Sequence, residues 1–599
     1  MNGFTTRPEI SGTFGVVTST HWLASAAGFG ILERGGNAFD AAVATGLALQ
    51  VVEPHLNGPA GEVPVIFRPA GGAVQVVCGQ GVAPAAATIA ALQALGLDLV
   101  PGSGLLAATN PGSWDAWMLL LRDHGTMSVA EVLAPAIDLA ERGHPLMPRV
   151  ANSIAELAPF FREHWPSSAA TWLPGDQVPQ ARALFANPDL ARTYQRLADL
   201  ATEAGSRDAG IEAAREAWRT GFVAQAIAGY CAGAEVMDVS GTAHGALLTA
   251  EDLASWQASI EAPTPLPYRD WTVYKTGPWG QGPVLLQALA ILRGYDIAAM
   301  DPHGPDFVHL VIEAMKLAFA DREAYYGDPA HSDIPLEALL SEDYAVTRRA
   351  QITAAASHEH RPGRLPGLEH LAEAAIARAA RRYDVGLGAT AGEPTMAHLA
   401  QKTEKRGDTV HLDVIDRWGN VVSATPSGGW LQSSPVVPGL GFPLGTRAQM
   451  FWLEEGLPTS LAPGRRPRTT LTPSIAIHKD GTVLAFGTPG GDQQDQWNLI
   501  LFLYLAEFGM SLQQALDTPL FHSLHMQSSF YPREAFPGAM VIEPGFGDAT
   551  ITELKRRGHK VTVAPEWSIG RLTAAKRDPD GLLHAGATPR LMQAYAIGR

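Results

Sequence analysis

A change of pattern near residue 409 constrains the fold of this chain more than any other feature. From Thr409 onward, short apolar runs alternate with tight turns, which is typical of β-hairpins. Three hairpins are predicted in this region, at residues 410–425, 474–486 and 572–585. The first third of the chain alternates predicted helices with short strands, and residues from about 109 to 400 are mostly helical in pattern and rich in alanine. We therefore expect an α+β protein with a helix-rich N-terminal part and a hairpin-rich C-terminal sheet.

The helices of the first part have recognisable boundaries. Residues 24–34 predict a helix, and Asn37, followed by Asp40 three residues later, is typical of the capped start of a second one. Residues 307–326 form the most regular helical pattern, with one apolar face. The run Asp321-Arg322-Glu323 on this helix is most simply interpreted as a polar face.

Length, charge and cysteine content exclude several classes of protein. The chain has 599 residues, enough for several small domains or one large composite unit, and a net charge of −16. A negative surplus disfavours nucleic-acid binding, and two cysteines rule out a disulfide scaffold. The longest apolar run has eight residues, and the N-terminus does not resemble a signal peptide. We expect a cytoplasmic protein with no membrane partner.

The hairpin that begins at Thr409 brings hydroxyl groups together. If its turn centres on Trp418, Thr409 lies opposite Ser427, with Thr425 two residues earlier. Opposed side chains in an antiparallel pair lie about 4.5–5.5 Å apart. The hydroxyls at the open end of this hairpin are either a catalytic cluster or an ordinary cross-strand Thr/Ser pair.

A glycine-rich turn, Gly487-Thr488-Pro489-Gly490-Gly491-Asp492, follows a predicted strand. Two backbone N–H groups of adjacent glycines can point at one spot, which suits an oxyanion or a phosphate. The phosphate interpretation lacks the spacing of a P-loop, and a plain strand-to-helix turn is the alternative. No HExxH motif is present, and an isolated histidine such as His411 is usually structural, so we expect neither a metal nor a cofactor.

Several strings in one order resemble landmarks of the γ-glutamyltransferase family. The resemblance covers nearly the whole chain, from about residue 16 to residue 598. Its strings are GGNAFDAAVATGLALQVVEP (35–54), NPGS (110–113), LAPAIDLAERG (133–143), HLVIEAMKLAFADREAYYGDP (309–329), GDTVH (407–411), TLTPS (470–474) and GTPGG (487–491).

This resemblance implies an N-terminal-nucleophile hydrolase with a four-layer αββα fold. Such a protein is an inactive precursor, or zymogen, that cuts itself before a threonine. Here the cut falls between Asp408 and Thr409, giving a large chain, 1–408, and a small catalytic chain, 409–599, that stay together as a heterodimer. Further homo-oligomers are also compatible with the resemblance.

The resemblance also assigns roles to the hydroxyl cluster and the glycine turn. Thr409 is the nucleophile and its new α-amine the base, with Ser427 as the supporting hydroxyl and Thr425 beside it. Gly490 and Gly491 match the oxyanion hole. An α-amine has a pKa of about 7.7–8.0, so it is substantially neutral at working pH.

Side chains that grip the γ-glutamyl head group in this family are replaced here. Gln80 stands where the family has arginine, Gly429 replaces an asparagine, the loop carboxylate aligns near Met450, and the Ser-Ser pair becomes Thr469-Thr470. Glutamine does not replace the permanent charge of an arginine clamp. The polar groups that remain to bind an acyl group are Arg447, Asp492 and Gln493.

The sequence thus predicts a self-processing enzyme for small amides, either γ-glutamyl compounds or related ones. The departures resemble the branch with oxamate amidohydrolases and cephalosporin-acylase-like proteins. Two alternatives stay open: an uncleaved, non-catalytic binding relative, and a nucleotide-binding protein that uses residues 487–491.

Overall fold

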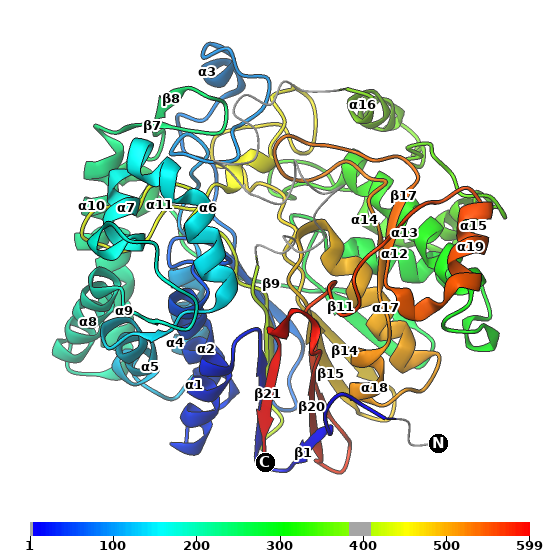
Figure 1. Cartoon of the computed structure of the whole chain (residues 1–599), viewed down its shortest axis with the longest axis horizontal. Helices are drawn as coiled ribbons and strands as arrows, with labels where there is room; N and C mark the ends of the chain where they lie inside the picture. The colour runs from blue at the N-terminus through cyan, green and yellow to red at the C-terminus, as the bar shows by residue number, and fades with distance from the viewer. Residues whose placement is uncertain (1–3, 382–408) are drawn as a thin grey trace.

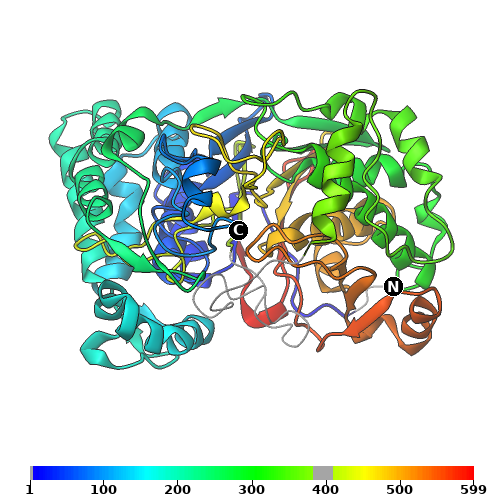
Figure 2. The ribbon, with the colours of Figure 1, turned by 90° about the horizontal axis from the view of Figure 1, so that it is seen from above.

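The computed structural model describes residues 4–381 and 409–599, and it is a mixed helix–strand protein built around two antiparallel sheets. Its strands lie between two groups of helices (Figures 1 and 2). No described helix combines the length and the apolar character needed to cross a membrane.

The first sheet has seven strands, mostly from the C-terminal part. Their order across the sheet is β1 (Ile10–Gly12), β20 (Leu583–Ala587), β19 (Thr573–Arg577), β15 (Val483–Gly487), β14 (Ser474–His478), β11 (Trp271–Lys275) and β10 (Thr264–Tyr268). Two of the predicted hairpins, β14–β15 and β19–β20, form its centre.

The second sheet also has seven strands, and the remaining predicted hairpin, β12–β13, lies at its middle. The order is β21 (Tyr595–Gly598), β2 (Gly15–Ser19), β12 (Leu412–Asp416), β13 (Val421–Ala424), β3 (Val63–Arg68), β4 (Gln75–Gly79) and β9 (Ser259–Glu261). Both sheets therefore combine strands from before and after residue 408.

Helices cover the outer faces of the sheets. Those of the first third are mainly α1 (Trp22–Glu33), α2 (Ala38–Val52), α4 (Ser113–His124), α5 (Val129–Glu141), α8 (Pro188–Glu203) and α9 (Arg207–Arg219), and α1 and α2 pack on the sheet that holds β12. The other group includes α12 (Pro283–Leu292), α13 (Pro305–Tyr325), α17 (Gln494–Ala506) and α18 (Leu512–Asp517). Of these, α12, α17 and α18 pack on the other sheet, and α13 packs on α12 (Figure 1).

The local predictions for α2 and α13 had different outcomes. Asn37 and Asp40 form the predicted capping box at the start of α2. The interpretation of residues 321–323 as a polar face of α13 is wrong, because all three side chains are buried. Buried charges need partners, and Arg322 makes ion pairs with Glu323 and Asp492.

Five buried apolar clusters fill the interior of the described residues, and the three largest connect the main layers. One joins α1 and α2 to the β12 sheet, and another joins α12, α13 and α17 to the β15 sheet. The third contains side chains of both sheets, including Val16, Ile66, Ile475 and Val483. This cluster packs the two sheets against each other.

Candidate functional site

Thr409 precedes β12 and faces Ser427 across an antiparallel bridge. The Thr409 hydroxyl donates a hydrogen bond to Ser427 Oγ at 3.2 Å, and both residues are buried. Farther along the hairpin, Leu412 pairs with Ala424. The register predicted from a turn centred on Trp418 is thus confirmed.

The Thr425 hydroxyl contacts a buried histidine. His411 Nδ1 lies 2.9 Å from Thr425 Oγ1, and His411 Nε2 lies 2.9 Å from Asp413 Oδ1. His411 therefore has a partner at each ring nitrogen, as expected of a structural histidine. Of the three hydroxyls predicted to converge, two contact each other and the third belongs to the His411 group.

Asp413 joins the two sheets beneath the hydroxyl pair. It accepts hydrogen bonds from Ser423 at 2.8 Å, Thr18 at 3.0 Å and Thr573 at 2.9 Å. These residues lie on β13, β2 and β19, so one carboxylate connects strands of both sheets. Since a buried carboxylate needs such donors, the group holds the start of β12 in a fixed place.

Arg447 lies beside Ser427, in a short 3₁₀ turn. Its Nη2 donates to Ser427 Oγ at 3.1 Å, and its Nε donates to Glu62 Oε1 at 2.5 Å. Arg447 and Glu62 are 1% and 2% exposed, so this is a buried ion pair. Burial raises the pKa of Glu62, and the charge of Arg447 opposes that rise.

Aromatic rings surround the Arg447 guanidinium. Its central carbon lies 5.1 Å from the Trp430 ring centroid and 5.8 Å from that of Phe530. A Cβ on Gly491 would lie 3.0 Å from the Phe530 ring. The Gly490–Gly491 turn and the Arg447 group therefore contact the same ring, although they are far apart in sequence.

The glycine turn has a backbone that only glycine adopts easily. Gly490 has φ 137° and Gly491 has φ 56°, and a Cβ on Gly490 would lie 2.4 Å from Trp497. Among the described residues, no hydrogen bond uses the backbone N–H of Gly490 or Gly491. Two N–H groups in such a turn remain available to an anion.

Asp492, predicted to bind substrate, is already paired within the protein. It lies 2.5 Å from Arg322, and it accepts hydrogen bonds from the Ser529 backbone at 2.8 Å and hydroxyl at 2.6 Å. Gln493 is half-buried, and its backbone N–H donates to Gly490. Its side chain makes no hydrogen bond within the described ranges.

Thr469 lies near the glycine turn through Gln281. The Thr469 carbonyl accepts a hydrogen bond from the Gln281 backbone at 2.9 Å, and the Gln281 side chain donates to Gly491 at 3.2 Å. The hydroxyl of Thr470 and Oε1 of Gln80 are buried and have no hydrogen-bond partner in the described part of the chain. Asp408 lies outside the described residues.

One group of side chains has the composition of a metal site. Donor atoms of His309, Glu313 and His559 lie within 4.8 Å of one another, and all three residues are buried. Glu313, however, is 2.6 Å from Lys316 and 2.9 Å from Arg361. These two cations neutralise the carboxylate and disfavour an added metal ion.

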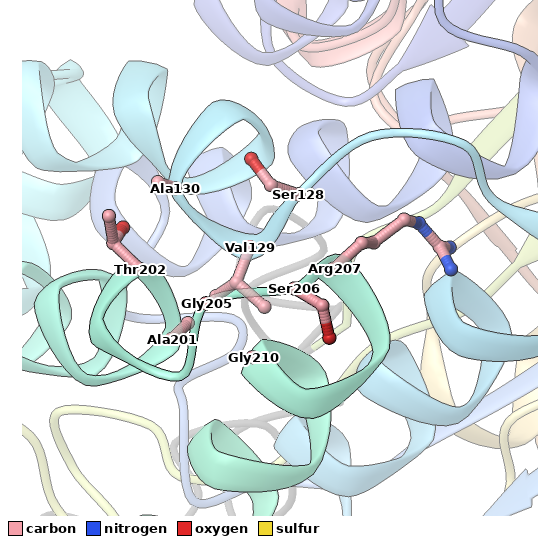
Figure 3. Close-up of a pocket in the computed structure, with 9 residues that line it drawn as sticks. All are labelled: Ser128, Val129, Ala130, Ala201, Thr202, Gly205, Ser206, Arg207 and Gly210. Atoms are coloured by element: carbon pink, nitrogen blue, oxygen red, sulfur yellow. The ribbon is translucent and has the colours of Figure 1, made fainter.

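A surface pocket of about 260 Å³ lies between α5 and α9 (Figure 3). Its hydroxyl groups on Ser128 and Ser206 cap those two helices, and Arg207 donates to backbone carbonyls of Gly125 and Met127. These polar groups hold the helices in place, and the described lining of the pocket does not contain a hydroxyl pair like Thr409 and Ser427.

Glu62 is the site residue that the sequence interpretation missed. The signal was available, since Glu62 is a single charge between the glycine-rich run 58–61 and a buried apolar strand. Its partner is remote in sequence, however, so the pairing with Arg447 appears only in the fold.

The sequence model of a family described as Gamma-glutamyltranspeptidase matches residues 24–598. Three relatives are each 30% identical to this chain. The Glutathione hydrolase-like YwrD proenzyme of Bacillus subtilis matches over 97% of this chain and 98% of its own length. For the Acylase ACY 1 proenzyme of a Pseudomonas species the shares are 96% and 92%, and for the Oxamate amidohydrolase proenzyme of Klebsiella pneumoniae 96% and 97%.

Solved structures agree with these matches. The structure of LmbA2991HD superposes with a TM-score of 0.91 and 52% identity, covering 100% of both chains. The cephalosporin acylase from Bacillus halodurans superposes with a TM-score of 0.81 and 29% identity, covering 100% of this chain and 98% of its own. The sequence resemblance, including its acylase and oxamate amidohydrolase branch, is therefore confirmed.

Proposed function

Because the chain belongs to the gamma-glutamyltranspeptidase family, we propose that it is a self-processing amidohydrolase that acts through an ester on Thr409. The observation that carries the proposal is the buried hydrogen bond from the Thr409 hydroxyl to Ser427. A glycine turn whose N–H groups are not used by any described residue contacts the Phe530 ring, which also lies near Arg447. The relatives' names support the class of reaction, since they describe hydrolases and an acylase, each as a proenzyme.

Self-cleavage between Asp408 and Thr409 creates the active enzyme. It makes residue 409 an N-terminus, and the new α-amine is the base that takes the Thr409 proton. The hydroxyl oxygen then attacks the amide carbonyl, and the protonated amine returns its proton to the leaving nitrogen. Water hydrolyses the ester in the second half of the reaction.

The N–H groups of Gly490 and Gly491 stabilise the negative charge of the tetrahedral intermediate. Loss of one such donor in other enzymes lowers the rate about 10²–10³-fold. The positive φ angles of both glycines, and the closeness of Gly491 to Phe530, support this assignment.

The substrate in this proposal is a small amide, and a γ-glutamyl head group is a poor fit. Gln80 is uncharged, while Arg447 and Asp492 form buried ion pairs with Glu62 and Arg322. Few charges thus remain for an amino-acid head group, which favours oxamate-type or acyl-lactam-type amides.

The proposal includes the assembly of the molecule. Residues 1–408 and 409–599 form one heterodimer in a four-layer αββα arrangement. Support comes from the three largest apolar clusters and from sheets that combine strands of both parts.

Kinetics of the processed protein test the proposal. A panel of γ-glutamyl anilide, oxamate and acyl-lactam amides should include a substrate that wild type hydrolyses, with glycylglycine accelerating γ-glutamyl anilide turnover little. Thr409→Ala should be inactive toward the same compound. Hydrolysis that persists in Thr409→Ala would refute the assigned nucleophile.

A further inference from the structure

We propose that Glu62 and Arg447 are positioning residues that hold Ser427 in place to assist Thr409. In this role Arg447 acts on the rate of the reaction and does not grip the substrate's carboxylate. The inference rests on the proposed function, since it assumes that Thr409 is the nucleophile.

Ser427 lies between the nucleophile and the ion pair. Its backbone exchanges two hydrogen bonds with Glu62, at 2.8 Å and 3.0 Å, while the Val410 N–H donates to the Pro426 carbonyl at 3.0 Å. The segment that carries Ser427 is thus fixed on both sides. Its hydroxyl oxygen lies 3.2 Å from Thr409 Oγ1 and 3.1 Å from Arg447 Nη2.

The arrangement of donors orients the Ser427 hydroxyl. Its oxygen has two lone pairs, and Arg447 and Thr409 each donate to it. Before the reaction, Ser427 is therefore an acceptor for the Thr409 proton. When the α-amine takes that proton, the Ser427 O–H rotates to donate to the Thr409 oxygen and keeps its own proton.

Arg447 stabilises the state in which the Ser427 hydroxyl donates to the Thr409 oxygen. A charged donor on the Ser427 oxygen makes the Ser427 O–H a better donor to the developing negative charge, since chains of hydrogen bonds polarise one another. The positive charge is also separated from Thr409 by a single hydroxyl group, and all three residues are buried, where charges interact more strongly than in water.

Glu62 keeps the guanidinium in this orientation. Both Nε and Nη2 of Arg447 contact Glu62 Oε1. Glu62 is the ion-pair partner of Arg447 among the described residues. Removing it would leave a buried charge without that counter-ion, which is strongly unfavourable. With Glu62, the arginine is already neutralised, so a substrate carboxylate has little to gain from it.

Gly428 gives an independent way to disturb the pair. Its φ is +73°, and a Cβ there would lie 2.3 Å from Glu62 Oε2. Gly428→Ala therefore displaces the Glu62 carboxylate without removing a charge. Gly439 is a matched control, since its φ is +80° but no atom lies within 4 Å of its Cβ position.

The test is single-turnover and steady-state kinetics, on whichever amide wild type hydrolyses, for Glu62→Gln, Arg447→Gln and Gly428→Ala. Because each variant weakens a charge-assisted hydrogen bond, kcat and the acylation rate should fall about 10–100-fold. KM should stay within about twofold, because the lost interaction belongs to the transition state. Self-cleavage of the precursor should slow as well.

Two controls separate this role from simple loss of stability. Gly439→Ala should retain wild-type kcat. Glu543→Gln breaks the Arg590–Glu543 pair, which is equally buried, and should lower the melting temperature without lowering kcat in the folded protein. If Glu62→Gln and Arg447→Gln do not fold, the kcat of Gly428→Ala is compared with that of Gly439→Ala, and a lower kcat in Gly428→Ala alone supports the proposal.

Each other outcome contradicts the proposal. A higher KM with unchanged kcat would make Arg447 a substrate clamp, and wild-type kinetics in all three variants would make the pair purely structural. A wild type that is processed but hydrolyses no amide refutes the proposed function instead, before any variant is compared.

Discussion

At the scale of single residues, removing the Ser427 hydroxyl tests whether its contact with Thr409 supports catalysis or only stabilises the fold. Ser427→Ala removes a neutral hydrogen bond from Thr409, worth about 0.5–1.5 kcal/mol, and a charge-assisted one from Arg447, worth about 1.5–3 kcal/mol. The variant should therefore fold with a moderate loss of stability, yet turn over substrate more slowly than wild type. Thermal unfolding and kcat of the same preparation check this. Wild-type rates in Ser427→Ala would mean that the pair only holds the strands together.

Asp492 has a different role from the one its sequence position suggests. It is paired with Arg322 and Ser529, so Asp492→Asn leaves a buried arginine with less compensation. Breaking a buried pair typically costs about 3–5 kcal/mol, and the remaining Glu323 partner should reduce that loss. We expect lower stability in urea unfolding and a KM close to wild type. A large rise in KM with wild-type stability would instead show that Asp492 binds the substrate.

At the scale of elements, the C-terminal end of α2 carries a buried acid near the site. Glu53 caps this helix, accepts hydrogen bonds from Thr20 and Gln593, and is fully buried. Burial raises its pKa from 4.5 to about 7. The adjacent Thr20 N–H donates to the His411 carbonyl at 3.2 Å, which connects this acid to the strand that begins at Thr409.

This raised pKa predicts a pH-dependent stability. The folded state holds the Glu53 proton more tightly than the unfolded state, so its stability falls as pH rises from about 4.5 to 7. Glu53→Gln does not ionise, so its free energy of unfolding should not fall in this way. As pH rises through that window, the stability of Glu53→Gln minus that of wild type should increase by up to about 3 kcal/mol. Urea unfolding at pH 4.5 and 8 measures the difference. A difference that does not change with pH would show that Glu53 titrates normally.

The β12–β13 hairpin and α13 show what sequence patterns can and cannot predict. The register of the hairpin could be predicted from its turn alone, because the position of one turn determines which residues of the two strands are paired. The polar run 321–323 was misinterpreted because its partners, Asp492 and Arg468, are remote in the chain. Glu62 and Arg447 were not paired for the same reason. Local patterns therefore predicted the strands and the hydroxyl pair, whereas contacts over long sequence separations needed the fold.

At the scale of the whole molecule, residues before and after position 408 cannot separate easily. In one sheet β12 pairs with β2 and β13 pairs with β3, and in the other β20 pairs with β1 and β14 pairs with β11, so both sheets would lose strand pairs. The two chains made by cleavage should therefore remain one particle in size-exclusion chromatography, while a denaturing gel shows two bands. Dissociation of the native protein into separate chains would contradict this arrangement.

The central claim, that Thr409 becomes the N-terminal nucleophile, has one direct test. Intact-mass analysis and N-terminal sequencing of protein purified without added protease should give two chains, with the smaller one starting at Thr409. Thr409→Ala should remain a single chain of 599 residues. A smaller chain that begins at another residue, or a wild-type protein that stays uncut and still hydrolyses its substrate, would contradict the account.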